Sequence, residues 1–139
     1  HEIIGMSRAT GQNIRVLPKV LGLIEPCDIF INNAYANGKQ LEFCSSFNYD
    51  KMIVCGSVVA DVPDPLLPEY SLHKQQLDTF VRELQLSNQS SILLLKLSGN
   101  SYNKTKMLLD VIELWLSHPY IETVSFAHGE RNDPVTNTQ

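Results

Sequence analysis

Three side chains in the middle of the chain have the types and spacing needed for proton transfer. Tyr70 and Lys74 are four residues apart in a segment with helical periodicity, so they share one face of a helix. An ammonium beside a tyrosine favours the phenolate, and such a tyrosine can donate or accept a proton near neutral pH. Ser57 ends an apolar segment thirteen residues before Tyr70 and could hydrogen-bond the same substrate oxygen. We therefore predict that Ser57, Tyr70 and Lys74 form a catalytic set.

The spacing of the tyrosine and lysine is a weak signal by itself. It occurs at three places, Tyr35/Lys39, Tyr70/Lys74 and Tyr102/Lys106. The first pair spans an Ala-Asn-Gly turn, so its members need not share a face. The third has a glutamine, not a serine, thirteen residues earlier. The serine singles out Tyr70, and the alternative is that Tyr70 is only an aromatic residue at a helix start with Lys74 as a solvated charge.

Five short apolar segments are predicted to be strands: Glu2–Ser7, Cys27–Asn32, Lys51–Ser57, Ser91–Leu97 and Glu122–His128. Four of them contain adjacent bulky apolar residues where a half-exposed strand would alternate with polar ones. A strand that is covered on both faces has this pattern, which is typical of a parallel sheet.

Helical periodicity appears between most of these strands. Apolar stripes predict one helix from Leu17, a second from about Pro68 with Leu77, Phe80, Val81 and Leu84 on one face, and a third from about Lys104 to Ser117 with Met107, Leu108, Val111, Ile112 and Trp115 buried. No helix is predicted between Phe43 and Asp50. The alternation predicts an α/β fold, a doubly wound parallel sheet of Rossmann-like type with three layers, α/β/α. Residues 1–128 are predicted to form this single domain and residues 129–139 a polar tail.

Ligands bind at the carboxyl ends of the strands in open parallel sheets. Small and polar residues collect at these ends, namely Ser7, Arg8, Asn32, Asn33, Ala34, Ser57, Ser98, Gly99 and Asn100. The sequence therefore predicts a cofactor along this edge of the sheet. The alternative for Asn32 and Asn33 is that they only satisfy the backbone of a turn.

With these motifs the chain resembles the short-chain dehydrogenase/reductase family. The resemblance rests on four motifs, Ile31-Asn32-Asn33-Ala34, Ile53-Val54-Cys55-Gly56-Ser57, Tyr70-Ser71-Leu72-His73-Lys74 and Leu95-Lys96-Leu97-Ser98-Gly99. It extends over most of the chain, and the Ser and Tyr-x-x-x-Lys set with its spacing is its specific part.

The resemblance implies an oxidoreductase that transfers a hydride between a nicotinamide and a carbonyl or alcohol substrate. Tyr70 would be the general acid in reduction and the base in oxidation, Lys74 would hold the nicotinamide ribose, and Ser57 would orient the substrate oxygen. The residues implied at the cofactor are Ser7, Arg8, Asn32, Asn33, Ala34, Tyr70, Lys74 and Ser98.

The choice of cofactor can be argued from charge. A carboxylate at the end of the relevant strand would bind a free ribose 2′-hydroxyl, but Met6, Ser7 and Arg8 stand there instead. The planar donor fork of Arg8 suits a phosphate, which favours NADP(H), with NADPH as reductant, over NAD(H). The alternative is that Arg8 is an exposed loop charge.

The chain also departs from the family pattern. The glycine-rich turn of the family is expected upstream of His1, because the chain opens directly in a predicted strand. The stretch from Asn33 to Ser57 shows no helix, although the family carries its fourth catalytic residue, an asparagine, and part of a dimer interface on a helix there. Asn48 has the wrong spacing for that role, and Tyr35 and Ser98 replace a family glycine and proline.

These departures keep two functions open. The first is the NADP(H)-dependent oxidoreductase, and the alternative is a non-catalytic nucleotide-binding or regulatory protein on the same scaffold. The resemblance also leaves room for a homo-oligomer.

Composition excludes several other classes. The net charge of −4 and the scattered basic residues argue against nucleic-acid binding, and no apolar run approaches the roughly 18 residues that a membrane helix needs. Neither the three cysteines nor the four histidines have metal-ligand spacing, so no metal site is predicted. The cysteines are interpreted as buried thiols of a cytoplasmic, reducing compartment.

Overall fold

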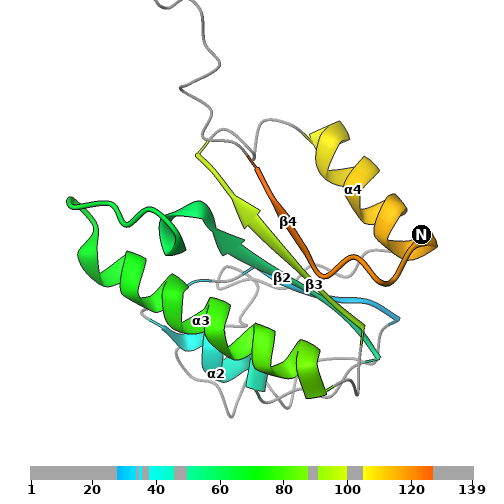
Figure 1. Ribbon diagram of the computed structural model, residues 1–139, viewed down its shortest axis with the longest axis horizontal. Helices are drawn as coiled ribbons and strands as arrows, with labels where there is room; N and C mark the ends of the chain where they lie inside the picture. The colour runs from blue at the N-terminus through cyan, green and yellow to red at the C-terminus, as the bar shows by residue number, and fades with distance from the viewer. Residues whose placement is uncertain are drawn as a thin grey trace, which may run out of the picture.

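A computed structural model describes residues 28–33, 35, 38–45, 50–87, 91–99 and 105–126. They form a four-stranded parallel sheet in the order β1 (Phe30–Asn32), β2 (Lys51–Ser57), β3 (Ser91–Leu97) and β4 (Thr123–Ser125), shown in Figure 1. The predicted α/β fold with a parallel sheet is confirmed. β1 and β4 are shorter than predicted, and the predicted strand Glu2–Ser7, the helix from Leu17 and the tail 129–139 lie outside the described residues.

The two central strands explain why the predicted strands contain adjacent bulky residues. β2 and β3 pair along their whole length, from Lys51 opposite Ser91 to Ser57 opposite Leu97. Alternate residues of both strands enter two separate cores, one with Met52, Val54, Ile92 and Leu94 and the other with Ile53, Cys55, Leu93, Leu95 and Leu97. Because both faces are covered, almost every side chain of these strands is buried.

Helices cover both faces of the sheet and complete the three predicted layers. α2 (Lys39–Ser45) and α3 (Pro68–Ser87) pack on one face, and α4 (Thr105–Ser117) packs on the other through Trp115 (Figure 1). The strands lie in sequential order, so the crossover through α4 has the opposite hand to those through α2 and α3. This is unusual, since parallel crossovers are nearly always right-handed.

The two long helices follow the predicted apolar stripes with one difference. α3 begins at a proline, as helices tolerate in their first turn, and buries Leu77 and Val81 against the sheet. In α4 only Trp115 is fully buried, and the prediction that Met107 is buried is wrong because its side chain is exposed. Met107 lies in the first turn of α4, two turns from the Trp115 contact that anchors the helix.

The prediction that the stretch from Asn33 to Ser57 has no helix is wrong, because α2 occupies residues 39–45, and so is the prediction of no helix after Phe43 for residues 43–45. Gly38 precedes the helix with a φ of 83°, a conformation that glycine adopts without strain. Gln40 and Cys44 are buried on the face of α2 that meets the sheet. An apolar stripe was missing from the sequence because one of these two buried positions carries a glutamine.

No helix among the described residues is both long enough and apolar enough to cross a membrane. Cys44 and Cys55 are buried and carry free thiols, as predicted, and Cys27 lies outside the described residues.

The packing of α3 generates a stability prediction with a matched control. Leu77 is 1% exposed and Leu86, on the same helix, is 83% exposed. We expect Leu77→Ala to lower the free energy of unfolding by about 2–5 kcal/mol, because it leaves a cavity against the sheet. Leu86→Ala should change it by no more than about 0.5 kcal/mol. Urea unfolding of both variants provides the measurement, and equal effects would contradict the packing described for α3.

Candidate functional site

A buried ammonium lies near the carboxyl ends of β1 and β2. Lys74 of α3 is only 6% exposed, and its Nζ donates hydrogen bonds to Gln40 Oε1 at 2.7 Å and to the Cys55 carbonyl oxygen at 3.1 Å. The lysine therefore joins α3 to α2 and to β2. Two of its three N–H donors are accounted for among the described residues.

Gln40 is the centre of this polar cluster. Its Nε2 donates to the carbonyl oxygens of Asn32 at 3.1 Å and Cys55 at 2.9 Å, and the Asn32 side-chain amide donates back to the Gln40 carbonyl at 3.1 Å. These bonds fasten α2 to the ends of both strands. Asn32 is fully buried, and its Oδ1 has no partner among the described residues.

The surroundings of Lys74 weaken its hold on a proton. Burial lowers the pKa of Lys74 from 10.5 to about 8, because its two acceptors are neutral and repay only part of the lost hydration. The same burial raises the pKa of the Cys55 thiol to about 11, with the nearby Lys74 charge acting in the opposite direction. The cluster can thus supply either an ammonium or a neutral amine at mildly alkaline pH.

Two tyrosine rings adjoin the ammonium, and a histidine contacts one of them. The centroids of Tyr35 and Tyr70 are 4.9 Å apart in an edge-to-face contact, and the Lys74 Nζ lies 5.8 Å and 5.6 Å from them. The Tyr35 hydroxyl is 2.8 Å from His73 Nδ1. The two distances from Lys74 Nζ to the tyrosine centroids are within the range of cation–π attraction. The structure therefore brings Tyr70 and Lys74 together on one face of α3, as their spacing predicts.

Of the other residues predicted at the site, some are buried at strand ends, one is exposed, and three lie outside the described residues. Ser57 is buried at the end of β2, where its Oγ accepts from the Val59 N–H at 3.2 Å and caps the short 3₁₀ helix η3 (Val58–Ala60). Ser98 is buried directly after β3, and Asn33 is exposed after β1. Three predicted cofactor residues lie outside the described residues: Ser7, Arg8 and Ala34.

Three residues at this site were missed from the sequence: Tyr35, Gln40 and His73. A turn separates Tyr35 from Lys39, so their spacing does not predict a shared face, and only the tertiary fold places the Tyr35 ring against Tyr70. Gln40 sits on a helix that the sequence did not predict. His73 has no metal-ligand spacing in the sequence, and an imidazole that hydrogen-bonds a tyrosine has no spacing pattern of its own.

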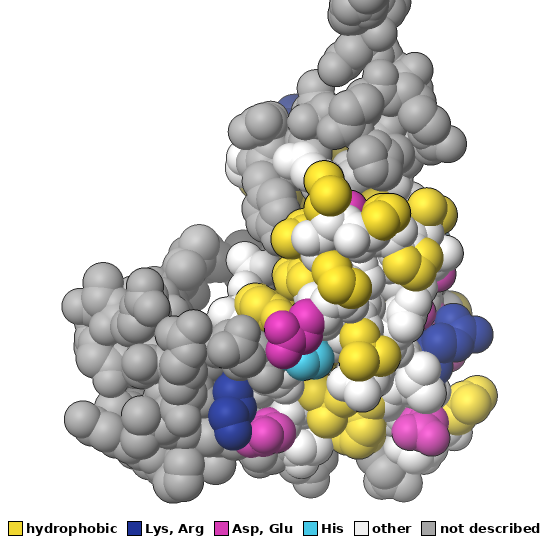
Figure 2. Space-filling view, turned by 90° about the vertical axis from the view of Figure 1, so that its left-hand side faces the viewer, with side chains coloured by type: hydrophobic (Ala, Val, Ile, Leu, Met, Phe, Trp, Pro, Cys, Tyr) yellow, Lys and Arg dark blue, Asp and Glu magenta, His cyan; other side chains and the backbone are white. Residues whose placement is uncertain are grey.

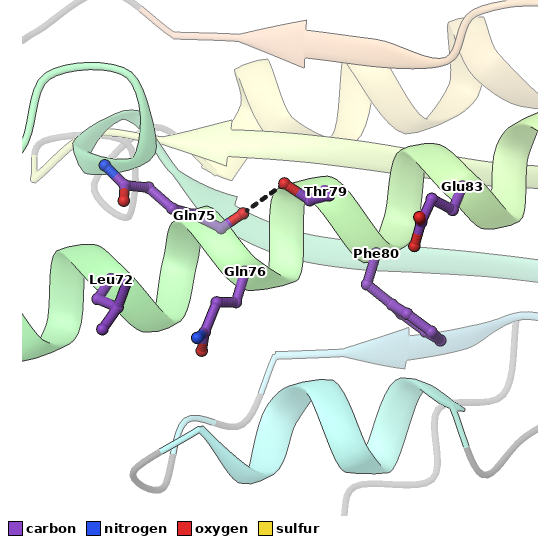
Figure 3. A pocket seen from close by; sticks show the side chains of 6 residues that line it. All are labelled: Leu72, Gln75, Gln76, Thr79, Phe80 and Glu83. Carbon is purple, nitrogen blue, oxygen red and sulfur yellow. Dashed lines mark hydrogen bonds between the residues drawn. The ribbon is translucent and has the colours of Figure 1, made fainter.

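A shallow groove lies elsewhere, along the outer side of α3 (Figure 3). It has a volume of about 370 Å³ and is lined by Leu72, Gln75, Gln76, Thr79, Phe80 and Glu83. None of the residues predicted at the site lines it. Within the described part of the chain, no three His, Cys, Asp or Glu side chains are grouped so that they could hold a metal ion.

Comparisons with known proteins leave the site to be interpreted from its own geometry. No protein-family model, no curated protein and no solved structure matches the chain.

The burial of Lys74 predicts a pH dependence of stability. The pKa of Lys74 is about 8 in the folded protein and 10.5 in the unfolded chain, where the side chain is hydrated. Between these two pH values the unfolded chain binds more protons than the folded protein, so the free energy of unfolding rises with pH. Relative to Lys74→Met, which does not titrate, the parent protein should gain on the order of 3 kcal/mol of unfolding free energy between pH 7.5 and 10.5. Denaturant unfolding at several pH values measures this difference. A constant difference across the range would show that the ammonium is not buried as described.

Proposed function

We propose that the chain is an NADP(H)-dependent oxidoreductase that transfers a hydride between a nicotinamide and a carbonyl or alcohol, of the short-chain dehydrogenase/reductase type. The observation that carries the proposal is the Lys74 ammonium held 5.6 Å from the Tyr70 ring, near the carboxyl ends of parallel strands. In open α/β sheets this edge is where ligands bind.

The chain's own residues have the roles that carbonyl reduction requires. Tyr70 donates its hydroxyl proton to the substrate oxygen, and the Lys74 charge stabilises the phenolate that remains. Ser57, at the end of β2, orients the substrate oxygen. The nicotinamide, when bound, supplies the hydride to the carbonyl carbon. The third N–H donor of Lys74 is suited to a ribose hydroxyl, and Asn33 and Ser98 lie at the same edge of the sheet.

α2 strengthens this proposal. The family pattern has an asparagine on a helix between the strands that correspond to β1 and β2, and the sequence alone showed no helix there. The structure has α2 in that place, and Gln40 on α2 contacts Lys74 directly. We assign to Gln40, which accepts a hydrogen bond from Lys74 at 2.7 Å, the task of holding the ammonium in position.

The second candidate is a nucleotide-binding protein without catalysis on the same scaffold. It is favoured by Tyr35, which stands where the family has a glycine and whose ring lies against Tyr70. The free, buried thiols of Cys44 and Cys55 support a reducing, cytoplasmic location under either candidate. A homo-oligomer stays a prediction, which sedimentation of the purified protein would test.

Replacing the acid separates the two candidates. Tyr70→Phe keeps the ring but removes the proton donor, so carbonyl reduction with NADPH should fall by roughly 10² to 10⁴-fold while NADPH binding stays close to that of the parent. Tyr120→Phe is the matched control, because Tyr120 is exposed and far along the chain from the site. Initial rates across a panel of aldehydes and ketones give the measurement. Turnover by Tyr70→Phe at the parent rate would refute this mechanism, and NADPH binding without any reduction by the parent would favour the second candidate.

The cofactor preference has its own test. NADPH should bind at least tenfold more tightly than NADH, because a charged, bidentate contact between Arg8 and the 2′-phosphate contributes about 1.5–3 kcal/mol. Arg8→Ala should remove most of that difference and leave NADH affinity unchanged. Calorimetric titration of both proteins with both cofactors provides the data. Equal affinities of the parent for NADPH and NADH would exclude Arg8 from the site.

A further inference from the structure

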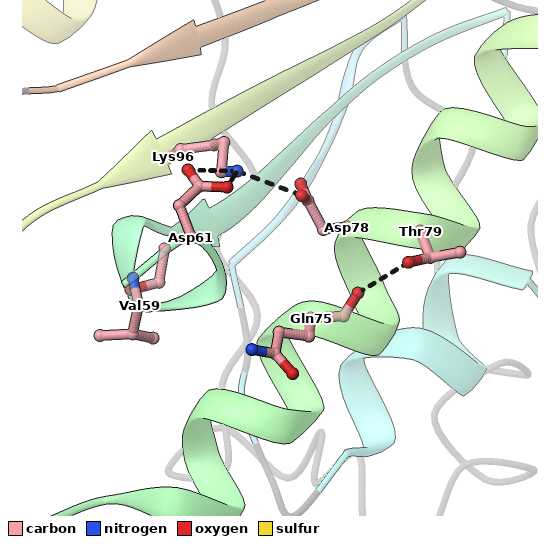
Figure 4. A network of polar contacts seen from close by, with 7 residues as sticks. Val59, Asp61, Gln75, Asp78, Thr79 and Lys96 are labelled. Carbon is pink, nitrogen blue, oxygen red and sulfur yellow. Dashed lines mark hydrogen bonds and ion pairs between the residues drawn. The ribbon is translucent and has the colours of Figure 1, made fainter. Parts of the chain in front are cut away.

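A second lysine is buried on the same side of the sheet as Lys74. Lys96 lies near the end of β3, paired with β2 and β4, and its side chain is 7% exposed. Its Nζ is 2.7 Å from the Asp61 carboxylate and 3.1 Å from Asp78 Oδ2 (Figure 4). None of these three residues was predicted to have a role.

The two carboxylates belong to different parts of the structure. Asp61 directly follows η3 in the segment that joins Ser57 to Tyr70, which we call the bridging loop (residues 58–67). Asp78 lies on α3, one turn beyond Lys74. Lys96 therefore connects a central strand to both the bridging loop and α3. The loop lies between Ser57 and Tyr70 in the chain, and α3 carries Tyr70 and Lys74.

The bridging loop has little apolar packing of its own to hold it. Val62, Leu66 and Leu67 are all exposed, and Figure 2 shows apolar side chains gathered at the surface on this side of the molecule. The loop is held instead by polar contacts. Beyond the Asp61 ion pair, the Asp64 N–H donates to Ser71 Oγ of α3 at 3.0 Å, and Ser57 Oγ accepts from Val59.

We propose that Lys96 is a positioning residue, which holds the bridging loop against α3 and so sets the placement of Ser57 relative to Tyr70. The proposal rests on the function proposed above for these two residues. The ion-paired Lys96 contributes little net stability compared with an apolar residue of similar size, because its buried ammonium loses hydration. Its contribution here is directional, since one ammonium with two acceptors fixes three elements at once.

The carboxylates keep Lys96 charged. Burial by itself would lower the pKa of Lys96, but hydrogen bonds to Asp61 and Asp78 and their charges raise it instead. The tie between loop and helix is thus present throughout the neutral pH range.

Asp61→Asn is the informative variant. Asp61 is 55% exposed, and Lys96 keeps Asp78 as a partner when the Asp61 charge is removed, so the variant should fold. We expect kcat for carbonyl reduction to fall roughly 10- to 100-fold with the KM for NADPH unchanged, because Lys74, which would contact the cofactor, and its hydrogen bond to Gln40 are untouched. Asp61→Glu, which retains the carboxylate on a loop with room to adjust, should recover most of the rate. Asp110→Asn is the matched control, since Asp110 forms an ion pair with Lys106 that is exposed on α4.

A second measurement does not depend on catalysis. Amide hydrogen exchange in the bridging loop of Asp61→Asn should become roughly tenfold faster or more, while residues 52–54 and 92–94 in the central strands keep their protection. Unchanged loop exchange, or a parent-like kcat in Asp61→Asn, would overturn the role of Lys96. If the parent reduces no carbonyl compound, the proposed function fails, whereas faster loop exchange would still support Lys96 as the residue that positions the loop.

Discussion

A buried ammonium must find acceptors within the protein, and this constraint shapes the structure around α3. The face of the sheet that α3 covers contains two such groups, Lys74 and Lys96, and they are accommodated in opposite ways. Lys74 has neutral acceptors, an amide and a main-chain carbonyl, and its pKa falls to about 8. Lys96 has two carboxylates, and its pKa rises. Lys74 therefore loses its proton more readily than a solvated lysine, and Lys96 holds its proton more tightly.

The two lysines organise different parts of the same edge of the sheet. Lys74 is bonded to α2, because the Gln40 side-chain amide points inward and accepts a hydrogen bond from the ammonium. Gln40 in turn donates hydrogen bonds to main-chain carbonyls near the ends of β1 and β2. Lys96 holds the bridging loop through its ion pair with Asp61. Short elements that bury little apolar surface are thus held by charge-assisted hydrogen bonds, which are directional where apolar packing is not.

The Tyr35, Tyr70 and His73 rings form one group of side chains beside Lys74, in which Tyr35 stands where the family pattern named above has a glycine. A glycine in place of Tyr35 would leave the Tyr70 ring without its edge-to-face neighbour and His73 without its hydrogen bond. The side chain of Tyr35 is itself exposed, and its ring contacts both Tyr70 and His73 of α3. Under the function proposed above, a substrate at Tyr70 would also meet the Tyr35 ring.

Most of the framework could be derived from sequence because it depends on local periodicity. The adjacent bulky residues of Lys51–Ser57 and Ser91–Leu97 require cover on both faces, and the stripe through Leu77 and Val81 has helical spacing, so the parallel sheet and α3 followed directly. The i and i+4 spacing likewise placed Tyr70 beside Lys74. The hydrogen-bond partners of the two buried lysines could not be derived from the sequence. Gln40 lies 34 residues from Lys74, and Asp61 lies 35 residues from Lys96. A hydrogen bond across such separations leaves no period in the chain, because it depends on how helices and loops are brought against the sheet, and only the tertiary structure decides that.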